Sequence, residues 1–466
     1  MATVRIFKHH LRLSILLLAA TEAVVLAAAV YLAAHLRYLS AHGPDGAPLV
    51  PMGLRAATFA TVTLLALAAT GLYQAQMRDR LPGVLQRLAV AALLSVTALA
   101  LLYYLVPPLF VDRSPLALAV LLGFSGVLVV RLLFYRYFQD MFQRRVLVLG
   151  SGRNASSIAA LRRRSDRRGF RILGFVHVRG DEDQIDADRV LHLERPLVDY
   201  AEDRGVDEIV LAVDDRRKDF LPHELLRCRM AGIQVTELIG FFERETGKIR
   251  LDFLNPSWLI FSDGFQRSAL RDGTKRLLDV VVSLTLFAAV WPVMALTALA
   301  ILLESGPGAP ILYRQVRVGQ NGRPFRILKF RSMKTDAEQA GRPQWAARND
   351  DRITRVGRFI RRTRIDELPQ LWNVLRGDMS FVGPRPERPE FTVSLADSLP
   401  YYSERHLVKP GITGWAQLNY PYGASIEDAR EKLQYDLYYV KNHTTFLDLA
   451  ILLQTVAVVL FGKGAR

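Results

Sequence analysis

Four long apolar stretches occupy the first 138 residues of the chain. They cover residues 13–34, 56–73, 88–106 and 116–134, and the first contains a single acid, Glu22. A membrane-spanning helix needs about 20 mostly apolar residues, and each stretch comes close to this length. The first stretch is too long for the apolar core of a signal peptide, and no small-residue cleavage site closes it. The pattern therefore predicts a four-helix transmembrane bundle over residues 1–143.

Basic residues in the connecting segments predict the orientation of this bundle. Lys and Arg are frequent before the first stretch, between the second and third, and after the fourth, and they are sparse in the two other loops. Because positively charged short loops stay on the cytoplasmic side, the N-terminus and the chain directly after the fourth stretch are expected in the cytoplasm. The residues that carry this bias are Arg5, Lys8, Arg12, Arg78, Arg80, Arg87, Arg136, Arg144 and Arg145.

A fifth apolar block, residues 277–303, differs from the other four because Pro292 lies near its middle. Proline removes a helical hydrogen bond and favours a kink. The arms 277–291 and 292–303 would each extend roughly 18–22 Å, which is less than a bilayer core of about 30 Å. The basic sequence that follows also fits the cytoplasmic face. We therefore predict a linker and re-entrant membrane helix over residues 263–303, bent at Trp291-Pro292; a straight fifth span is the alternative.

Between these membrane segments, short apolar runs alternate with polar segments. The run 146–149 leads into Gly150, Gly152 and Ala155, which match the G-x-G-x-x-[GA] turn of dinucleotide-binding folds. Further strand-like runs at 172–178, 208–213 and 234–238 predict a Rossmann-like, doubly wound α/β domain over residues 144–262. The acid expected at the end of the second strand is missing. Binding of a nicotinamide nucleotide, binding of another phosphate-bearing or regulatory ligand, and a structural or dimerising role therefore stay open.

Composition narrows the partners of the chain. Its 466 residues hold 61 Lys and Arg against 45 Asp and Glu, a formal net charge of +16. This excess indicates an anionic partner such as nucleic acid, anionic lipid or a phosphorylated substrate. The single cysteine, Cys228, excludes an intrachain disulfide framework and a multi-cysteine metal site.

Most of the charged motifs lie after residue 304. Lys329-Phe-Arg-Ser-Met333 follows a strand-like run, the adjacent acids Asp366 and Glu367 end a ladder of arginines, and Gly383-Pro-Arg-Pro386 presents one guanidinium. Arginine offers paired donors to phosphoryl oxygens, and a carboxylate can attack phosphorus or hold Mg²⁺. The pattern favours chemistry on phosphate; surface acids beside a solvated arginine face are the alternative. The ladder consists of Arg352, Arg355, Arg358, Arg361, Arg362 and Arg364.

These motifs resemble those of one enzyme family. The run Arg364-Ile-Asp-Glu-Leu-Pro-Gln-Leu-Trp-Asn-Val-Leu-Arg-Gly-Asp-Met-Ser-Phe-Val-Gly-Pro-Arg-Pro386 is similar to the signature of the bacterial sugar transferases, which are monotopic polyprenyl-phosphate phosphoglycosyl transferases. Residues 329–333 and Lys409-Pro-Gly-Ile-Thr-Gly-Trp-Ala-Gln417 match the same family, and the similarity covers about residues 272–466. The preceding layout resembles the large members of the family. Residues 420–425 and the Gly-Lys-Gly-Ala-Arg end are similar to the exopolysaccharide-initiating subgroup associated with exosortase-type systems.

The resemblance implies a two-step transfer and a role for each motif residue. Asp366 would attack the β-phosphate of a UDP-sugar and release UMP, and polyprenyl phosphate, usually undecaprenyl phosphate, would then take the phosphosugar from the aspartate. Glu367 would hold Mg²⁺ or assist the lipid phosphate. The family commonly breaks its re-entrant helix at Ser-Pro, whereas this chain has Trp291-Pro292. The implied phosphate-binding residues are Lys329, Arg331, Arg364 and Arg385, with Asp378 and Asp436 as secondary candidates for active-site support or local capping.

The resemblance also implies a location and partners. The chain would be a multi-pass protein of the bacterial inner membrane with its soluble domains on the cytoplasmic face, in contact with UDP-sugar, polyprenyl phosphate and membrane lipids but not nucleic acid, and it would form a homodimer. A mostly helical α/β monotopic catalytic domain over residues 304–466 would end in an interfacial helix, residues 446–461, which is short for a span. The alternative is a membrane-anchored nucleotide sensor or scaffold of polysaccharide assembly, which would release no UMP.

Overall fold

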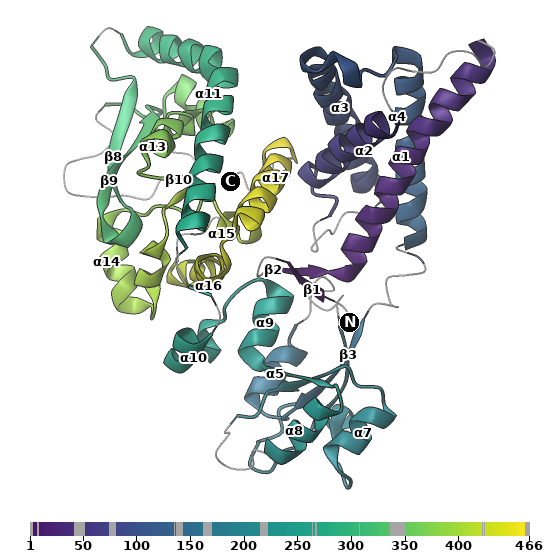
Figure 1. Ribbon diagram of the computed structural model, residues 1–466. Coiled ribbons are helices and arrows are strands. Elements are labelled where there is room, and N and C mark those ends of the chain that lie inside the picture. The colour runs from purple at the N-terminus through teal and green to yellow at the C-terminus, as the bar shows by residue number, and fades with distance from the viewer. Residues whose placement is uncertain are drawn as a thin grey trace. The chain divides into compact units, whose positions relative to one another are not determined.

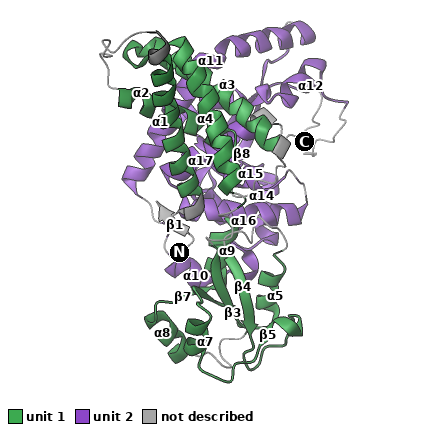
Figure 2. Cartoon of the chain, turned by 90° about the vertical axis from the view of Figure 1, so that its right-hand side faces the viewer, with its two compact units in different colours: residues 1–247 green, residues 248–466 purple. Residues whose placement is uncertain are grey.

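The computed structural model describes residues 3–6, 9–41, 52–73, 81–134, 136, 143–161, 170–214, 222–262, 264–265, 268–306, 308–335, 351–421, 423 and 425–461 (Figure 1). It divides into two compact units, residues 1–247 and 248–466 (Figure 2). The first unit holds an apolar helical bundle and a parallel α/β domain, and the second holds all the motifs found after residue 304.

The N-terminal part of the first unit is helical, as the four apolar stretches predict. Each of its four main helices contains a segment long and apolar enough to cross a membrane. Leu26, Phe59, Leu67 and Val127 are fully buried where these helices meet. The elements are β1 (Thr3–Ile6), β2 (His9–Arg12), α1 (Leu13–Ala41), α2 (Met52–Ala69), α3 (Leu81–Leu105), η1 (Pro107–Leu109) and α4 (Arg113–Leu133).

A buried ion pair crosses this bundle. Arg131 on α4 places its Nε 2.6 Å from Oε1 of Glu22 on α1, and its Nη1 donates to the carbonyl of Leu72 at 2.9 Å. The Tyr73 hydroxyl donates to the same carboxylate. Because charged groups inside a spanning bundle are costly unless paired, these contacts tie α1, α4 and the chain after α2 together. Glu22, the single acid of the first apolar stretch, thus has a structural role.

The α/β domain is a five-stranded parallel sheet with the order β5-β4-β3-β6-β7. In Figure 2, helices α7 and α8 lie on one side of this sheet and α5 lies on the other. The chain forms the strands on one side of β3 first and then those on the other side, which confirms the predicted doubly wound domain. The elements are β3 (Arg144–Leu149), α5 (Arg153–Ala159), β4 (Phe170–Val176), η3 (Ala187–Arg189), β5 (Val190–Leu191), α7 (Leu197–Asp203), β6 (Glu208–Leu211), α8 (Pro222–Met230), β7 (Gln234–Glu237) and α9 (Leu238–Thr246).

The end of this domain differs from the expected boundary at residue 262. Residues from Lys248 onward belong to the second unit. The amide of Ile249 donates to the carbonyl of Gln434 at 3.0 Å, and Lys248 Nζ donates to Glu431 at 2.7 Å. These contacts join segments more than 180 residues apart, so no local periodicity in the sequence indicates them.

The second unit combines one long helix with short helices and two two-stranded sheets. Strands β8 and β9 form an antiparallel hairpin, and β10 pairs in parallel with β11. The elements are η4 (Leu251–Phe253), α10 (Pro256–Phe261), α11 (Ala269–Ser305), β8 (Leu312–Val318), η5 (Gln320–Gly322), β9 (Pro324–Phe330), α12 (Arg355–Arg362), η6 (Ile365–Glu367), α13 (Gln370–Arg376), β10 (Ser380–Val382), α14 (Pro389–Ser398), η7 (Tyr402–Leu407), β11 (Gly411–Thr413), α15 (Trp415–Asn419), α16 (Ile426–Asn442) and α17 (Thr445–Phe461).

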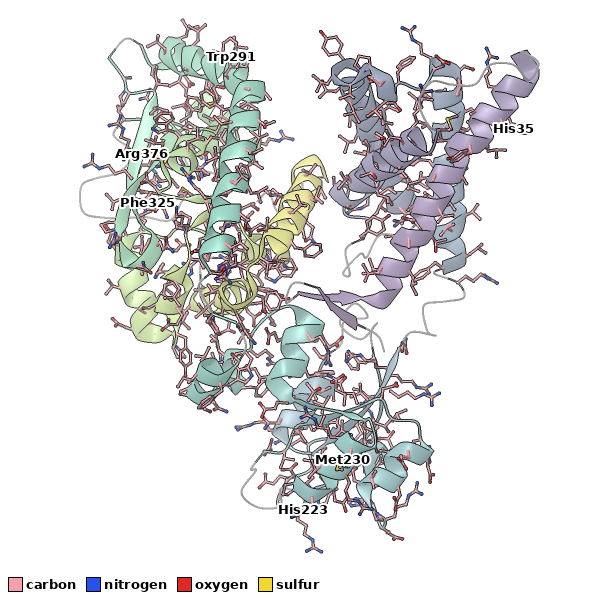
Figure 3. All side chains as sticks on the ribbon, in the orientation of Figure 1. His35, His223, Met230, Trp291, Phe325 and Arg376 are labelled. Carbon is pink, nitrogen blue, oxygen red and sulfur yellow. The ribbon has the colours of Figure 1, made fainter. Side chains whose placement is uncertain are left out.

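Helix α11 has 37 residues and contains Pro292. A straight helix of this length would extend about 55 Å. Figure 1 shows that α11 bends instead, and Trp291 is labelled at the bend in Figure 3. The bend agrees with the kink predicted at Trp291-Pro292.

Both ends of α11 contact the same group of short elements. Near its start, Asp279 accepts hydrogen bonds from Ser380 Oγ at 2.9 Å and from the amide of Phe381 at 2.8 Å. Near its end, Ile301 packs in a buried cluster with Phe330 and Ile360. Glu304 also accepts from the amide of Arg355 at 2.7 Å, which caps α12. The helix therefore leaves these elements and returns to them.

Candidate active site

Asp366 and Glu367 lie in a tight turn, η6, between α12 and α13. The preceding residue, Arg364, is one of four non-glycine residues in the described part of the chain with a positive φ, at 61°. Such backbone conformations cost about 1–3 kcal/mol and cluster at functional sites. Asp366 is only 8% exposed, and the Glu367 side chain is 12% exposed. The turn thus holds two adjacent carboxylates largely out of water.

Three cationic side chains from separate motifs surround the Glu367 carboxylate. Lys329 Nζ, from β9, donates to Glu367 Oε1 at 3.0 Å, and Arg385 Nη2, from the loop after β10, donates to the same oxygen at 2.9 Å. Arg364 Nη1 lies 3.9 Å from it. The structure therefore brings together Glu367 and three of the four residues that the sequence predicted to bind phosphate.

The two acids have opposite pKa shifts. Burial raises the pKa of Asp366 above its ordinary value, with Lys329 opposing this effect and Glu367 reinforcing it. Burial would also raise the pKa of Glu367, but Arg385 and Lys329 outweigh it and hold that pKa well below its usual range. Glu367 therefore stays ionised in acid, whereas Asp366 takes up a proton more readily than an ordinary aspartate does.

Two buried side chains, one just after the end of β9 and one in η6, have polar atoms without a hydrogen-bond partner among the described residues. Asp366 Oδ1 has no partner among the described residues. Arg331, two residues beyond Lys329 in the chain, is 8% exposed, and its Nε and Nη2 likewise have no partner in the described part of the chain. An unmet buried donor or acceptor costs about 1–3 kcal/mol, so such groups indicate a place where a ligand supplies the missing contact.

Asp436 supports the site from behind Arg385 instead of lining it. Its Oδ2 accepts from Arg405 Nε at 3.0 Å, and Arg405 Nη2 donates to the backbone carbonyl of Arg385 at 3.0 Å. Asp436 is 2% exposed and Arg405 is 5% exposed. This ion pair therefore holds the loop that presents the Arg385 guanidinium. Arg405 lies outside every motif that the sequence analysis identified.

Close backbone approach brings the Gly383-Pro-Arg-Pro386 loop against the Lys409–Gln417 motif. The amide of Gly383 donates to the carbonyl of Thr413 at 2.9 Å, and the amide of Gly411 donates to that of Pro384 at 2.9 Å. A Cβ on Gly383 would overlap the carbonyl oxygen of Lys409, so only glycine fits there. The two motifs thus form one structural element, joined by the β10–β11 pair.

Asp378 lies at the C-terminal end of α13. Its Oδ2 is 3.4 Å from Asn373 Nδ2 and 3.6 Å from Arg376 Nε. Asn373 in turn accepts from the amide of Leu328 at 2.9 Å and so ties α13 to β9. Of the two roles that the sequence left open for Asp378, this position favours local capping.

Polar residues at the start of α11 also hold the site. Arg276 donates to the carbonyls of Val374 and Leu375 on α13, both at 2.5 Å. Lys275 donates to the carbonyl of Val382 at 2.9 Å and to Asp448 at 2.7 Å. The sequence showed Lys275 and Arg276 only as charges before an apolar block. Their contacts join segments about 100 residues apart.

The carboxylates of Asp366 and Glu367 fit a metal site that is completed by the substrate. The described residues contain no group of three or more His, Cys, Asp or Glu that could hold a metal ion by themselves. Mg²⁺, however, is commonly bound by one or two carboxylates, with substrate phosphates and water as its other ligands. An ionised Glu367 next to the unpartnered Oδ1 of Asp366 fits this second arrangement.

The glycine loop of the α/β domain lies in the first unit. Gly150 and Gly152 form the turn between β3 and α5, as predicted, and Gly150 has a φ of 122°. The amides of Arg153 and Asn154, which follow this turn, donate to the carboxylate of Asp214. Asp214 lies just beyond β6 and was not among the predicted residues.

The chain matches two protein families. Residues 270–462 match the bacterial sugar transferase family, and residues 68–221 match a family described as a CoA-binding domain. The first match contains the entire Glu367 site and both arms of α11.

Three similar proteins are transferases by name. The chain is similar to the UDP-N-acetylgalactosamine-undecaprenyl-phosphate N-acetylgalactosaminephosphotransferase of Aeromonas hydrophila. The two are 42% identical over 268 residues, which cover 57% of this chain and 62% of that protein. It is 34% identical over 333 residues to the undecaprenyl-phosphate glucose phosphotransferase of Komagataeibacter xylinus, covering 69% of this chain and 60% of that protein. The chain thus spans about three fifths of the length of these two relatives.

A third relative is covered more fully. The UDP-glucose:undecaprenyl-phosphate glucose-1-phosphate transferase of Caulobacter vibrioides is 46% identical over 196 residues, which are 42% of this chain and 72% of that protein. Together with the match over residues 270–462, this similarity shows that the chain belongs to the bacterial sugar transferase family.

Proposed function

We propose that the chain transfers a sugar-1-phosphate from a UDP-sugar to undecaprenyl phosphate, which gives an undecaprenyl-diphosphate-sugar and UMP and begins the assembly of an exopolysaccharide. The observation that carries this proposal is the arrangement around η6. A buried aspartate with an unpartnered oxygen stands beside a glutamate held by Lys329 and Arg385. The names of the relatives support the substrate class, since they include both glucose and N-acetylgalactosamine transferases.

The proposed reaction has two phosphoryl transfers. In the first, an Asp366 carboxylate oxygen bonds to the β-phosphorus of the UDP-sugar, the bond from that phosphorus to the bridging oxygen breaks, and UMP leaves. In the second, a phosphate oxygen of the lipid bonds to the same phosphorus and the bond to Asp366 breaks, which restores the carboxylate. The unpartnered Oδ1 supports the choice of Asp366 as nucleophile, because it gives up no hydrogen bond in order to attack.

The surrounding cations have distinct roles in this proposal. Lys329, Arg364 and Arg385 neutralise phosphoryl oxygens, with Arg385 and Lys329 exchanging part of their contact with Glu367 for the substrate. Arg331 supplies unmet guanidinium donors to a phosphate. Glu367 would hold Mg²⁺, which would neutralise the diphosphate charge when bound.

The direct test is an assay of UMP release by the purified full-length protein in detergent micelles with undecaprenyl phosphate and Mg²⁺. A panel that includes UDP-glucose and UDP-N-acetylgalactosamine should give release with at least one sugar, and the preferred sugar defines the specificity. Absence of release with every sugar of the panel from folded protein would favour a membrane-anchored sensor or scaffold of polysaccharide assembly. The proposal also includes a homodimer, which light scattering in detergent tests. It further places the chain in the exosortase-associated subgroup, which the neighbouring genes test.

We also propose that α11 enters the cytoplasmic leaflet and returns, as part of an inner-membrane protein whose soluble parts face the cytoplasm. The contacts of Asp279 with β10 and of Ile301 and Glu304 with β9 and α12 support this, because a straight helix would separate Asp279 from Glu304 by about 38 Å. Tags after Phe138, after Ser268 and at Arg466 should report the cytoplasm, and a tag at Gly43 the periplasm. A periplasmic tag at Arg466 would instead show that α11 spans the bilayer.

The second unit should carry the chemistry without the first. All residues around Glu367 lie in the second unit, and Lys248 and Ile249 contact α16 within that unit. A shortened chain that begins at Lys248, reconstituted in lipid nanodiscs, should therefore still release UMP. Asp366→Asn in the same shortened chain is the control for background release. A folded, inserted but inactive short chain would show that the first unit takes part in catalysis.

The acid side of the pH profile should report Asp366. An attacking carboxylate must be ionised, and burial raises the pKa of Asp366 while Glu367 keeps its charge to much lower pH. We therefore expect kcat/KM to fall tenfold per pH unit as the pH drops through the raised pKa of Asp366, at a pH above the ordinary aspartate value of about 3.9. A profile that stays flat down to about that value would contradict the assignment of Asp366 as nucleophile.

A further inference from the structure

The glycine loop of the α/β domain has its backbone donors occupied by carboxylates of the same chain. Asp214 Oδ2 accepts from the amide of Arg153 at 2.8 Å, and its Oδ1 accepts from that of Asn154 at 2.7 Å. Asp181 accepts from the amide of Ser151 at 3.2 Å. In a dinucleotide-binding loop, such amides face a phosphate of the ligand.

The position of Asp214 coincides with the usual ligand position in this class of fold. Doubly wound sheets bind ligands at the carboxyl ends of the strands, in the crevice where the strand order reverses. In the order β5-β4-β3-β6-β7, this crevice lies between β3 and β6. Gly150 and Gly152 follow β3, and Asp214 follows β6, so the carboxylate enters the crevice from the opposite strand.

The same internal contact accounts for the glycines. A Cβ on Gly152 would overlap the Asp214 carboxylate, and a Cβ on Gly150 would meet the backbone of Ala212 at 2.6 Å. Gly150, which has a positive φ, is therefore required by the close approach of the chain after β6, and Gly152 leaves the space that the Asp214 carboxylate fills. The fingerprint needs no bound phosphate to explain it.

The two carboxylates at this loop oppose a phosphate. Asp181 is 9% exposed and also accepts from the amide of Asp214 through Oδ1 at 3.2 Å, so the two aspartates form one hydrogen-bonded group. An incoming phosphate would have to displace Asp214 from two amides and approach both negative charges. Like charges brought together at a binding surface cost several kcal/mol, which disfavours this exchange.

We infer that the glycine loop binds the chain's own Asp214 and Asp181 and is closed to nucleotide phosphates, so that the α/β domain works without CoA or a dinucleotide. This inference differs from the description of the family that matches residues 68–221, a CoA-binding domain. Among the described residues, the donors that would hold the CoA diphosphate at this loop already have partners.

Hydrogen exchange on the full-length protein in detergent micelles tests the inference at the loop itself. The amides of Arg153 and Asn154 should exchange slowly in the unmodified protein. Addition of CoA, NAD or inorganic pyrophosphate at millimolar concentration should leave exchange over residues 150–154 unchanged. Asp214→Ala should accelerate exchange of the peptide that begins α5, and Asp214→Asn, which keeps one acceptor, should accelerate it less. Asp188→Ala, which removes an exposed carboxylate of η3 in the same domain, is the matched control and should have no effect.

Three results would overturn the inference. Slower exchange over residues 150–154 with any of the three ligands would show that the loop binds phosphate after all. Unchanged exchange at Arg153 and Asn154 in both Asp214 variants would show that the carboxylate does not occupy the loop. Ligand protection of other peptides of the α/β domain would contradict the inference that this domain works without CoA or a dinucleotide. If Asp214→Ala does not fold, the Asp214→Asn variant and the ligand experiment still decide between these outcomes.

Discussion

Asp366→Asn should reduce transfer of the phosphosugar by several orders of magnitude. Asparagine keeps the shape of the side chain, but its amide is a poor nucleophile, so a covalent mechanism loses its first step. The other contacts around η6 should survive, because Glu367 and not Asp366 carries the ion pairs with Lys329 and Arg385. We therefore expect the variant to fold normally and to bind the UDP-sugar with little change in affinity.

The half-reaction separates a nucleophile from a metal ligand. With UDP-sugar and Mg²⁺ but no lipid, the unmodified protein should gain the mass of one phosphosugar on the peptide that contains Asp366, and Asp366→Asn should gain none. Asp378→Asn is the matched control, since Asp378 lies at the end of α13 near Asn373 and Arg376. Labelling at Glu367 would exchange the roles of the two acids. Turnover without labelling, even in rapidly quenched samples, would indicate direct attack by the lipid phosphate.

Motif residues were the easiest part of the site to predict. Lys329 and Arg385 both donate to one carboxylate oxygen of Glu367, although the three residues come from three segments. They could be predicted because each segment has a recognisable sequence of its own. Pro292 likewise indicated the bend of α11, since proline disrupts the helical hydrogen bonds wherever it occurs inside a helix.

Support residues could not be predicted in the same way. Arg405 acts on Arg385 through a backbone carbonyl and on Asp436 across 31 residues, and no spacing rule relates these positions. Strand β8 was also missed. Its sequence, Leu-Tyr-Arg-Gln-Val-Arg-Val, is mostly exposed and lacks a regular apolar face, so pairing with β9 is what forms it.

The glycine loop shows a different limit. The pattern of Gly150, Gly152 and Ala155 is the same whether the amides that follow hold a phosphate or the carboxylate of Asp214. Asp214 is about 60 residues away in the chain and becomes a neighbour only because β6 pairs with β3. The missing acid at the end of the second strand was the single sequence feature that pointed away from a dinucleotide.

Glu367→Gln should impair the proposed transfer in a way that differs from Asp366→Asn. Glutamine has the size of glutamate but no charge, so Lys329 and Arg385 would keep their positions near a neutral group and lose their counter-ion. Removal of one partner from a fully buried ion pair costs about 3–5 kcal/mol. The pairs of Glu367 are part-buried, so we expect a smaller but clear drop in melting temperature. Glu387→Gln is the matched control, because the Glu387 side chain is 30% exposed against 12% for Glu367 and lies 3.7 Å from Arg317, so its loss should lower the melting temperature less.

The kinetic signature of Glu367→Gln should identify its role. If Glu367 holds Mg²⁺, the variant should need a higher Mg²⁺ concentration for half-maximal activity. It should also be slower by more than about 10–100-fold, the range for residues that only support a metal ligand. The variant should still gain the phosphosugar on Asp366, but slowly, because the nucleophile is intact. A variant with an unchanged Mg²⁺ requirement would instead assign Glu367 to the positioning of Lys329 and Arg385.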